Sequence, residues 1–140
     1  MHFEASVIVK ARREKAYSTY TDFELLPRWS RQSRPVKVSR REGDKLYLES
    51  EGSSKGNKVI REMRLFPQER VESNRETRFT RTRSIVRFEE VPEGTKVTAS
   101  LDVEVKGRWA WILKTRGKAE VESSALEELN SFARYVEALP

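Results

Sequence analysis

Residues 119–139, AEVESSALEELNSFARYVEAL, carry apolar side chains at helical spacing. On a helical wheel of about 100° per residue centred on Leu129, the apolar side chains gather within about 80° of that residue. They are Ala125, Leu126, Phe132, Ala133, Val136 and Leu139. The pattern predicts an amphipathic helix roughly 30 Å long, because each helical residue adds about 1.5 Å. A helix of that length needs a broad apolar partner, which a β-sheet can supply.

Two strands are predicted before this helix, over residues 80–90 and 95–106, joined by the turn VPEG at 91–94. If Glu90 lies opposite Thr95, one face of the hairpin carries apolar and small hydroxyl residues and the other carries opposite charges. A slip by one residue would destroy both patterns, so the register is strongly specified. The inner pairs are Phe88 with Val97, Val86 with Ala99, Ser84 with Leu101 and Thr82 with Val103, and the outer pairs are Arg83 with Asp102 and Arg81 with Glu104.

Further strands are predicted by alternation at residues 2–10, 36–41, 45–49, 58–66 and 69–74. Residues 11–20 have helical spacing, and a second short helix is expected to begin at a capping box of Thr21 and Glu24 and to be limited by Pro27. Short turns between successive strands require antiparallel pairing and leave one apolar face to be covered. The predicted fold is therefore α+β, with an antiparallel sheet of about seven strands, two short helices after strand one and a long C-terminal helix.

Length and composition limit the classes of function. The 140 residues suit a single domain, 1–140, and no apolar run is long enough for a membrane span. The first residues lack the form of a signal peptide, so we expect a cytoplasmic protein. The absence of cysteine excludes disulfides and thiol chemistry, and a single histidine, His2, argues against a histidine-based metal site or catalytic triad. No cofactor is expected.

The positive charge is local. Residues 28–41, RWSRQSRPVKVSRR, carry six cations and no acid, which equals the net charge of the whole chain, +6. This basic stretch is interpreted either as a surface that meets an anion or as a solvated face that maintains solubility. Alternation along the predicted strand places Lys37 and Arg41 on the face away from Val36 and Val38.

Two segments resemble a known superfamily. DFELLPRW at 22–29, after the first helix, and PEGTKVTASLDVEV at 92–105, before the last, are similar to the polyketide cyclase/dehydrase-like branch of the START-like, Bet v 1-like (SRPBCC) superfamily. The resemblance implies a helix-grip fold, in which a curved antiparallel sheet wraps around the C-terminal helix and leaves a cavity. Members bind lipids, sterols, quinones or polyketides, and some catalyse cyclisation or dehydration.

The predicted inner face carries small hydroxyl residues where a filled core would carry larger apolar ones. One interpretation is a pocket for an apolar ligand; the alternative is a closed core in which these hydroxyls bond neighbouring backbone or buried water. Ser73, Thr80, Thr82 and Ser84 are the hydroxyl residues in question. The candidate ligand-binding residues are Trp29, Leu46, Leu48, Arg61, Met63, Ser73, Thr82, Ser84, Leu101, Lys118 and Glu122.

Three of these candidates are charged. Arg61 shares the phase of the apolar residues on its strand, so its guanidinium is expected to point inward and to need an acid such as Glu122 or a ligand carboxylate or phosphate. The alternative is a bulge or edge position that lets Arg61 reach solvent. Lys118 and Glu122 fall on the core-facing stripe of the helix. Either the first turns pass a wet cavity mouth, or Gly117 breaks the helix and the stripe begins later.

The leading hypothesis is binding or carrying of a hydrophobic small molecule, such as a lipid, a quinone or a polyketide-like compound. An alternative is a cyclase/dehydrase-type enzyme, which needs an acid or base inside the pocket. Among the candidates for that role, Glu72, Glu122 and Tyr47, the first and last fall on the outer face, so no catalytic residue is assigned. A second alternative is an RNA-, ribosome- or membrane-associated protein that uses the basic stretch, although only Trp29 offers a stacking ring there.

Overall fold

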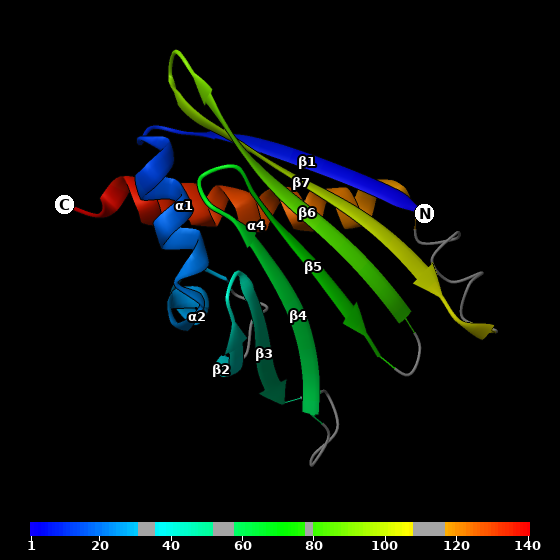
Figure 1. Cartoon of the computed structure of the whole chain (residues 1–140). Helices are drawn as coiled ribbons and strands as arrows, with labels where there is room; N and C mark the ends of the chain where they lie inside the picture. The colour runs from blue at the N-terminus through cyan, green and yellow to red at the C-terminus, as the bar shows by residue number, and fades with distance from the viewer. Residues whose placement is uncertain (31–35, 52–57, 78–79, 108–116) are drawn as a thin grey trace.

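The computed structural model describes residues 1–30, 36–51, 58–77, 80–107 and 117–140. A single antiparallel sheet of seven strands, in the order β1-β7-β6-β5-β4-β3-β2, forms one layer, and the helices lie against it (Figure 1). The strands are β1 (His2–Val9), β2 (Val36–Glu42), β3 (Lys45–Glu51), β4 (Lys58–Phe66), β5 (Arg70–Glu76), β6 (Thr80–Val91) and β7 (Gly94–Val105). The helices are α1 (Arg13–Thr21), the 3-10 turn η1 (Phe23–Leu25), α2 (Leu26–Trp29) and α4 (Lys118–Ala138). The α+β fold predicted from the sequence is confirmed.

The β6–β7 hairpin has the predicted register. Phe88 lies opposite Val97, Val86 opposite Ala99, Ser84 opposite Leu101 and Thr82 opposite Val103. Both predicted outer pairs, Arg83 with Asp102 and Arg81 with Glu104, also lie opposite each other. Arg81 and Glu104 form an ion pair at 3.8 Å, but Asp102 accepts a hydrogen bond of 2.9 Å from Nδ1 of His2 on β1 instead of binding Arg83. That bond, followed by one to Glu4, raises the pKa of His2.

Helix α4 packs beside the free edge of β1, where Figure 1 shows the two elements running together. Its apolar stripe buries Leu129, Phe132, Ala133 and Val136, as predicted. Two carboxylates of the helix cap the edge strand, because Glu122 accepts the Glu4 N–H and Glu137 accepts the Lys10 N–H, each at 2.9 Å. Satisfying these edge amides blocks pairing with another strand. Leu126, expected on the stripe, is instead 40% exposed.

The helices after β1 differ from the prediction at one point. Thr21 is not a capping residue; it ends α1, and its hydroxyl donates to the Tyr17 carbonyl at 2.9 Å. Asp22 precedes η1 without a side-chain cap. Pro27 lies in the first turn of α2, where its missing N–H costs nothing. Together α1, η1 and α2 bury an aromatic cluster against β6 and α4, consisting of Tyr17, Tyr20, Phe23, Trp29, Phe88 and Phe132.

The prediction for the basic strand is wrong at Arg41. The β2–β3 pairing shifts between Val38 and Arg40, so one extra residue is inserted in β2. After this bulge Arg41 lies opposite the buried Leu46 and therefore on the inner face, while Arg40 turns outward over the Tyr47 ring, 5.7 Å from its centroid. Lys37 and Arg41 are both exposed, as is Val38. An inserted residue reverses the facing of everything after it, which strict alternation could not anticipate.

Within the described residues, no helix is both long enough and apolar enough to cross a membrane.

Candidate functional site

The inner face of the sheet carries two rows of residues that lie opposite one another on successive strands. The first row runs from β7 to β3 through Val103, Thr82, Arg75, Arg61 and Leu48, and the second through Leu101, Ser84, Ser73, Met63 and Leu46. The two rows therefore bring together eight of the eleven sequence candidates. Leu46 and Leu48 of β3 and Met63 of β4 are at most 3% exposed, whereas the members of both rows on β5, β6 and β7 retain solvent-accessible surface.

Three residues of these rows carry small hydroxyl side chains. Ser73, Thr82 and Ser84 lie on the inner face, as predicted, and each keeps part of its surface accessible to solvent. None of their side chains makes a hydrogen bond to another described residue. The fourth hydroxyl residue, Thr80, does bond a neighbour, because its hydroxyl lies 2.8 Å from that of Thr77. For Ser73, Thr82 and Ser84 the pocket and the closed core with buried water both stay predictions. The hydroxyl groups of Ser73, Thr82 and Ser84 leave hydrogen-bonding capacity on this face.

Arg61 points to the inner face, in phase with Met63, and lies directly opposite Arg75 of β5. Desolvation, followed by the charge of Arg61, lowers the pKa of Arg75 although its side chain is exposed. The lowered pKa and the exposure together indicate that nearby protein atoms partly desolvate the Arg75 guanidinium while water still reaches it. Glu122, one of the partners considered for Arg61, instead accepts a hydrogen bond from the Glu4 N–H of β1. Sequence reasoning missed Arg75, although the two-residue spacing from Val71 and Ser73 could have placed it inward.

Two further polar groups face the same region and were not predicted as site residues. Tyr20 of α1 has its pKa raised to about 12, first by desolvation and then by Glu128 of α4, while Arg61 opposes the shift. Tyr20 nevertheless retains accessible surface. The Glu128 carboxylate accepts a hydrogen bond from the Ser30 hydroxyl. Glu128 stands at the border of the apolar stripe of α4, the position where a charge can turn toward the interior.

Trp29 packs in the aromatic cluster and also lines a surface groove. Its ring packs against Phe132 with centroids 5.0 Å apart, and its indole Nε1 is buried without a partner among the described residues. The Trp29 carbonyl accepts the Ser131 hydroxyl at 2.5 Å, which joins α2 to α4. The groove, of about 420 Å³, is lined by Pro27, Arg28, Trp29, Ser30, Ser131, Arg134 and Tyr135.

Other candidates lie outside the inner face. Lys118 is the exposed first residue of α4, which begins directly after Gly117. Tyr47 and Glu72 are on the outer face, as predicted. A hollow of about 240 Å³ is lined by charged and polar residues, most of them with side chains on the outer face. They are Glu62, Arg64, Glu72, Ser73, Asn74 and Arg83. Its described lining offers no apolar wall to hold a hydrophobic molecule.

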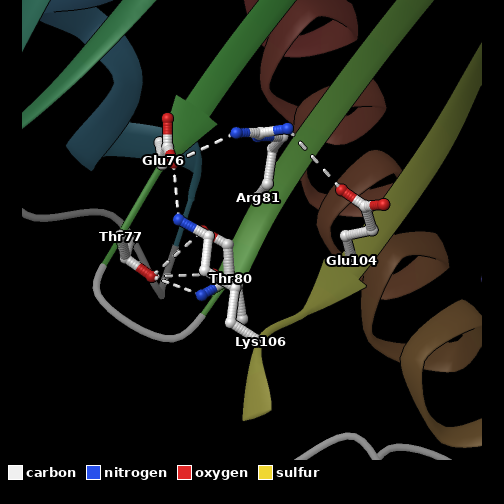
Figure 2. Close-up of polar contacts among 6 residues, drawn as sticks. All are labelled: Glu76, Thr77, Thr80, Arg81, Glu104 and Lys106. Carbon is white, nitrogen blue, oxygen red and sulfur yellow. Dashed lines mark hydrogen bonds and ion pairs between the residues drawn. The ribbon is translucent and has the colours of Figure 1, made fainter.

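The strand ends that carry Arg75 and Thr82 are held by a polar network on the outer face (Figure 2). The Glu76 carboxylate accepts hydrogen bonds from Lys106 at 2.5 Å and from Arg81 at 3.4 Å. Lys106, followed by Arg81, lowers the pKa of Glu76. Exposed ion pairs contribute little to stability. Their effect here is to tie β5, β6 and β7 together at one end of the sheet.

The fold matches several solved structures. The protein TTHA0849 of Thermus thermophilus superposes with a TM-score of 0.82 at 21% identity, covering 99% of this chain and 98% of its own. The Zhui aromatase/cyclase of Streptomyces sp. R1128 gives a TM-score of 0.80 at 14% identity, covering 98% and 93%. Ara h 8.0201 gives 0.71 at 14% identity, covering 99% of each chain. At these identities the likeness shows the fold, and the helix-grip arrangement is confirmed. No curated protein sequence matches the chain.

A family model described as polyketide cyclase / dehydrase and lipid transport matches residues 1–137. The match spans both segments on which the sequence resemblance rested, 22–29 and 92–105, and agrees with the seven-stranded sheet gripping α4. The chain therefore belongs to the polyketide cyclase/dehydrase and lipid transport family.

Proposed function

We propose that the protein binds a hydrophobic small molecule between the inner face of the sheet and α4. The observation that carries the proposal is the change along the two inner rows, from buried Leu46, Leu48 and Met63 to accessible Thr82 and Ser84. Apolar walls with a few polar groups are typical of small-molecule sites. The family description, which joins cyclases with lipid transport, supports the same class of ligand.

The proposed pocket predicts a loss of binding when its small residues are enlarged. Ser84→Leu and Thr82→Leu are each expected to weaken binding of the neutral probe N-phenyl-1-naphthylamine at least tenfold, because the added carbons occupy the space of the ligand. The measurement is fluorescence titration. Ser100→Leu and Thr98→Leu provide matched controls, since these residues lie on the outer face of the adjacent strand. Equal probe affinity in all four variants and the wild type would place the site elsewhere.

The protonation state of Tyr20 favours binding over catalysis. A cyclase or dehydrase needs an acid or base whose pKa lies near the working pH. Among the inner polar groups, Tyr20 has a pKa of about 12, which keeps it protonated far above neutrality. It can orient a ligand by donating a hydrogen bond, and it is a poor proton acceptor. A cyclase-type reaction is therefore the second candidate function.

The basic stretch supports a polyanion-binding function less well. Its described cations, Arg28, Lys37, Arg40 and Arg41, are exposed, but they do not share one face. Arg40 also pairs with Glu42. The remaining cations of the stretch, Arg31 and Arg34, lie outside the described residues.

A further inference from the structure

Arg61 and Arg75 form a like-charge pair that no described acid neutralises. They lie directly opposite each other on β4 and β5, on the inner face. Neither makes an ion pair or a hydrogen bond to another described residue. Side chains in such cross-strand positions have Cβ atoms about 5 Å apart, and like charges there are destabilising. The free protein thus maintains an unfavourable arrangement of two guanidinium groups.

Three acids of α4 have partners other than these arginines. Glu122 and Glu137 of α4 bind the edge amides of β1. Glu128 accepts the Ser30 hydroxyl, and although it and Arg61 both act on Tyr20, they are not within ion-pair distance of each other. The inner face therefore has an excess of positive charge next to apolar walls. An anion from outside the chain would remove the repulsion and satisfy the guanidinium donors.

We propose that Arg61 and Arg75 together hold the carboxylate of an amphipathic acid whose apolar body lies against Leu48 and Met63. Planar guanidinium groups bind carboxylates through two parallel hydrogen bonds, and such charged bonds are about twice as strong as neutral ones. Thr82, which lies opposite Arg75, supplies an unused hydroxyl beside the same position. This inference rests on the proposed function and specifies the class of ligand: an acid rather than a neutral lipid or sterol.

A matched pair of probes tests the acidic class of ligand separately from the proposed function. 8-Anilinonaphthalene-1-sulfonate and N-phenyl-1-naphthylamine share the same aromatic body, and only the former carries a charge. The wild type is expected to bind the sulfonate at least tenfold more tightly than the amine, because only the sulfonate meets the arginines. Decanoate, decyl phosphate and decan-1-ol then compete for the bound sulfonate. Decanoate is expected to displace it most effectively, decan-1-ol least, and stronger displacement by decyl phosphate would replace the carboxylate assignment with a phosphate.

Variants test the two arginines individually. Arg61→Gln and Arg75→Gln are each expected to reduce affinity for the sulfonate at least fivefold and to leave affinity for the amine within twofold. Arg83→Gln is the control, since Arg83 is an exposed cation on the outer face of the neighbouring strand with no ion pair to a described residue. It should change neither affinity.

The unfolding temperature of the free protein distinguishes a ligand-binding role of Arg75 from a structural one. Removing one member of a repelling pair should raise the unfolding temperature of the free protein by about 1 to 4 °C in Arg75→Gln. A fall in that temperature would identify Arg75 as a structural partner and overturn the proposal. Equal affinity of both probes in the wild type would also overturn it while leaving the pocket intact. If neither probe binds, the proposed function fails as well.

Discussion

Replacing Phe132 with alanine is expected to destabilise the protein by about 3 to 5 kcal/mol, the range for a fully buried aromatic side chain. Phe132 is 0% exposed and meets two rings edge-on, Tyr20 with a centroid distance of 5.6 Å and Trp29 with one of 5.0 Å. Each such pair adds roughly 0.5 to 1.5 kcal/mol beyond the area it buries. Phe132 thus packs α4 against rings from both α1 and α2.

Urea unfolding measures this effect, and Leu126→Ala on the same helix is the control. Leu126 is 40% exposed, so its truncation is expected to cost less than about 1 kcal/mol. A loss below about 1 kcal/mol for Phe132→Ala would show that α4 is not the element that organises the core.

Gly94→Ala is expected to cost about 2 to 4 kcal/mol, because the substitution combines backbone strain with a steric clash. Gly94 begins β7 with φ +144°, and a Cβ there would lie 2.2 Å from the carbonyl oxygen of Val9 and 3.1 Å from the nitrogen of Ala11. These are backbone atoms where β1 ends, so the clash can be relieved only by moving β1 away from the hairpin.

Gly43→Ala is the matched control, since Gly43 has φ +58° in the β2–β3 turn and no described atom lies within 4 Å of the place that a Cβ would take. It is expected to cost only about 1 kcal/mol, the strain of a left-handed alanine. Urea unfolding of both variants checks the comparison, and equal losses would contradict the close approach of β1 to Gly94.

The parts of the fold that could be predicted are those where one stretch carries two independent patterns. In the β6–β7 hairpin, apolar pairs such as Val86 with Ala99 and a charged pair, Arg81 with Glu104, specify the same register. The helix at 118–138 was predictable for a similar reason, because its stripe holds one phase from Leu129 to Val136. Arg61 could be placed inward from its strand alone.

What could not be predicted depends on contacts between distant segments. The facing of Arg41 depends on a bulge that alternation does not reveal. Glu122 looked like an inward charge because its wheel position is central, but that position faces the edge of β1, where backbone amides need acceptors. Tyr20 and Glu128 come from different helices, and only tertiary packing brings them to the same region.

If an apolar ligand lies on the inner face of the sheet, methyl groups on the two faces can report which face it contacts. Met63 is 3% exposed and lies on the inner face between Leu46 and Ser73. Ile60, 57% exposed, and Ile85 are on the outer face of the same sheet. Among the methionine and isoleucine methyl groups labelled with ¹³C, Met63 therefore reports on the inner face, and Ile60 and Ile85 report on the outer face.

The decisive measurement is an NMR experiment that detects through-space contacts between bound N-phenyl-1-naphthylamine and these methyl groups, with Met63→Leu used to assign the Met63 signal. We expect contacts from the aromatic protons of the probe to the Met63 methyl and none to Ile60 or Ile85. Contacts to the two isoleucines, or a bound probe that contacts none of the three, would contradict binding between the sheet and α4.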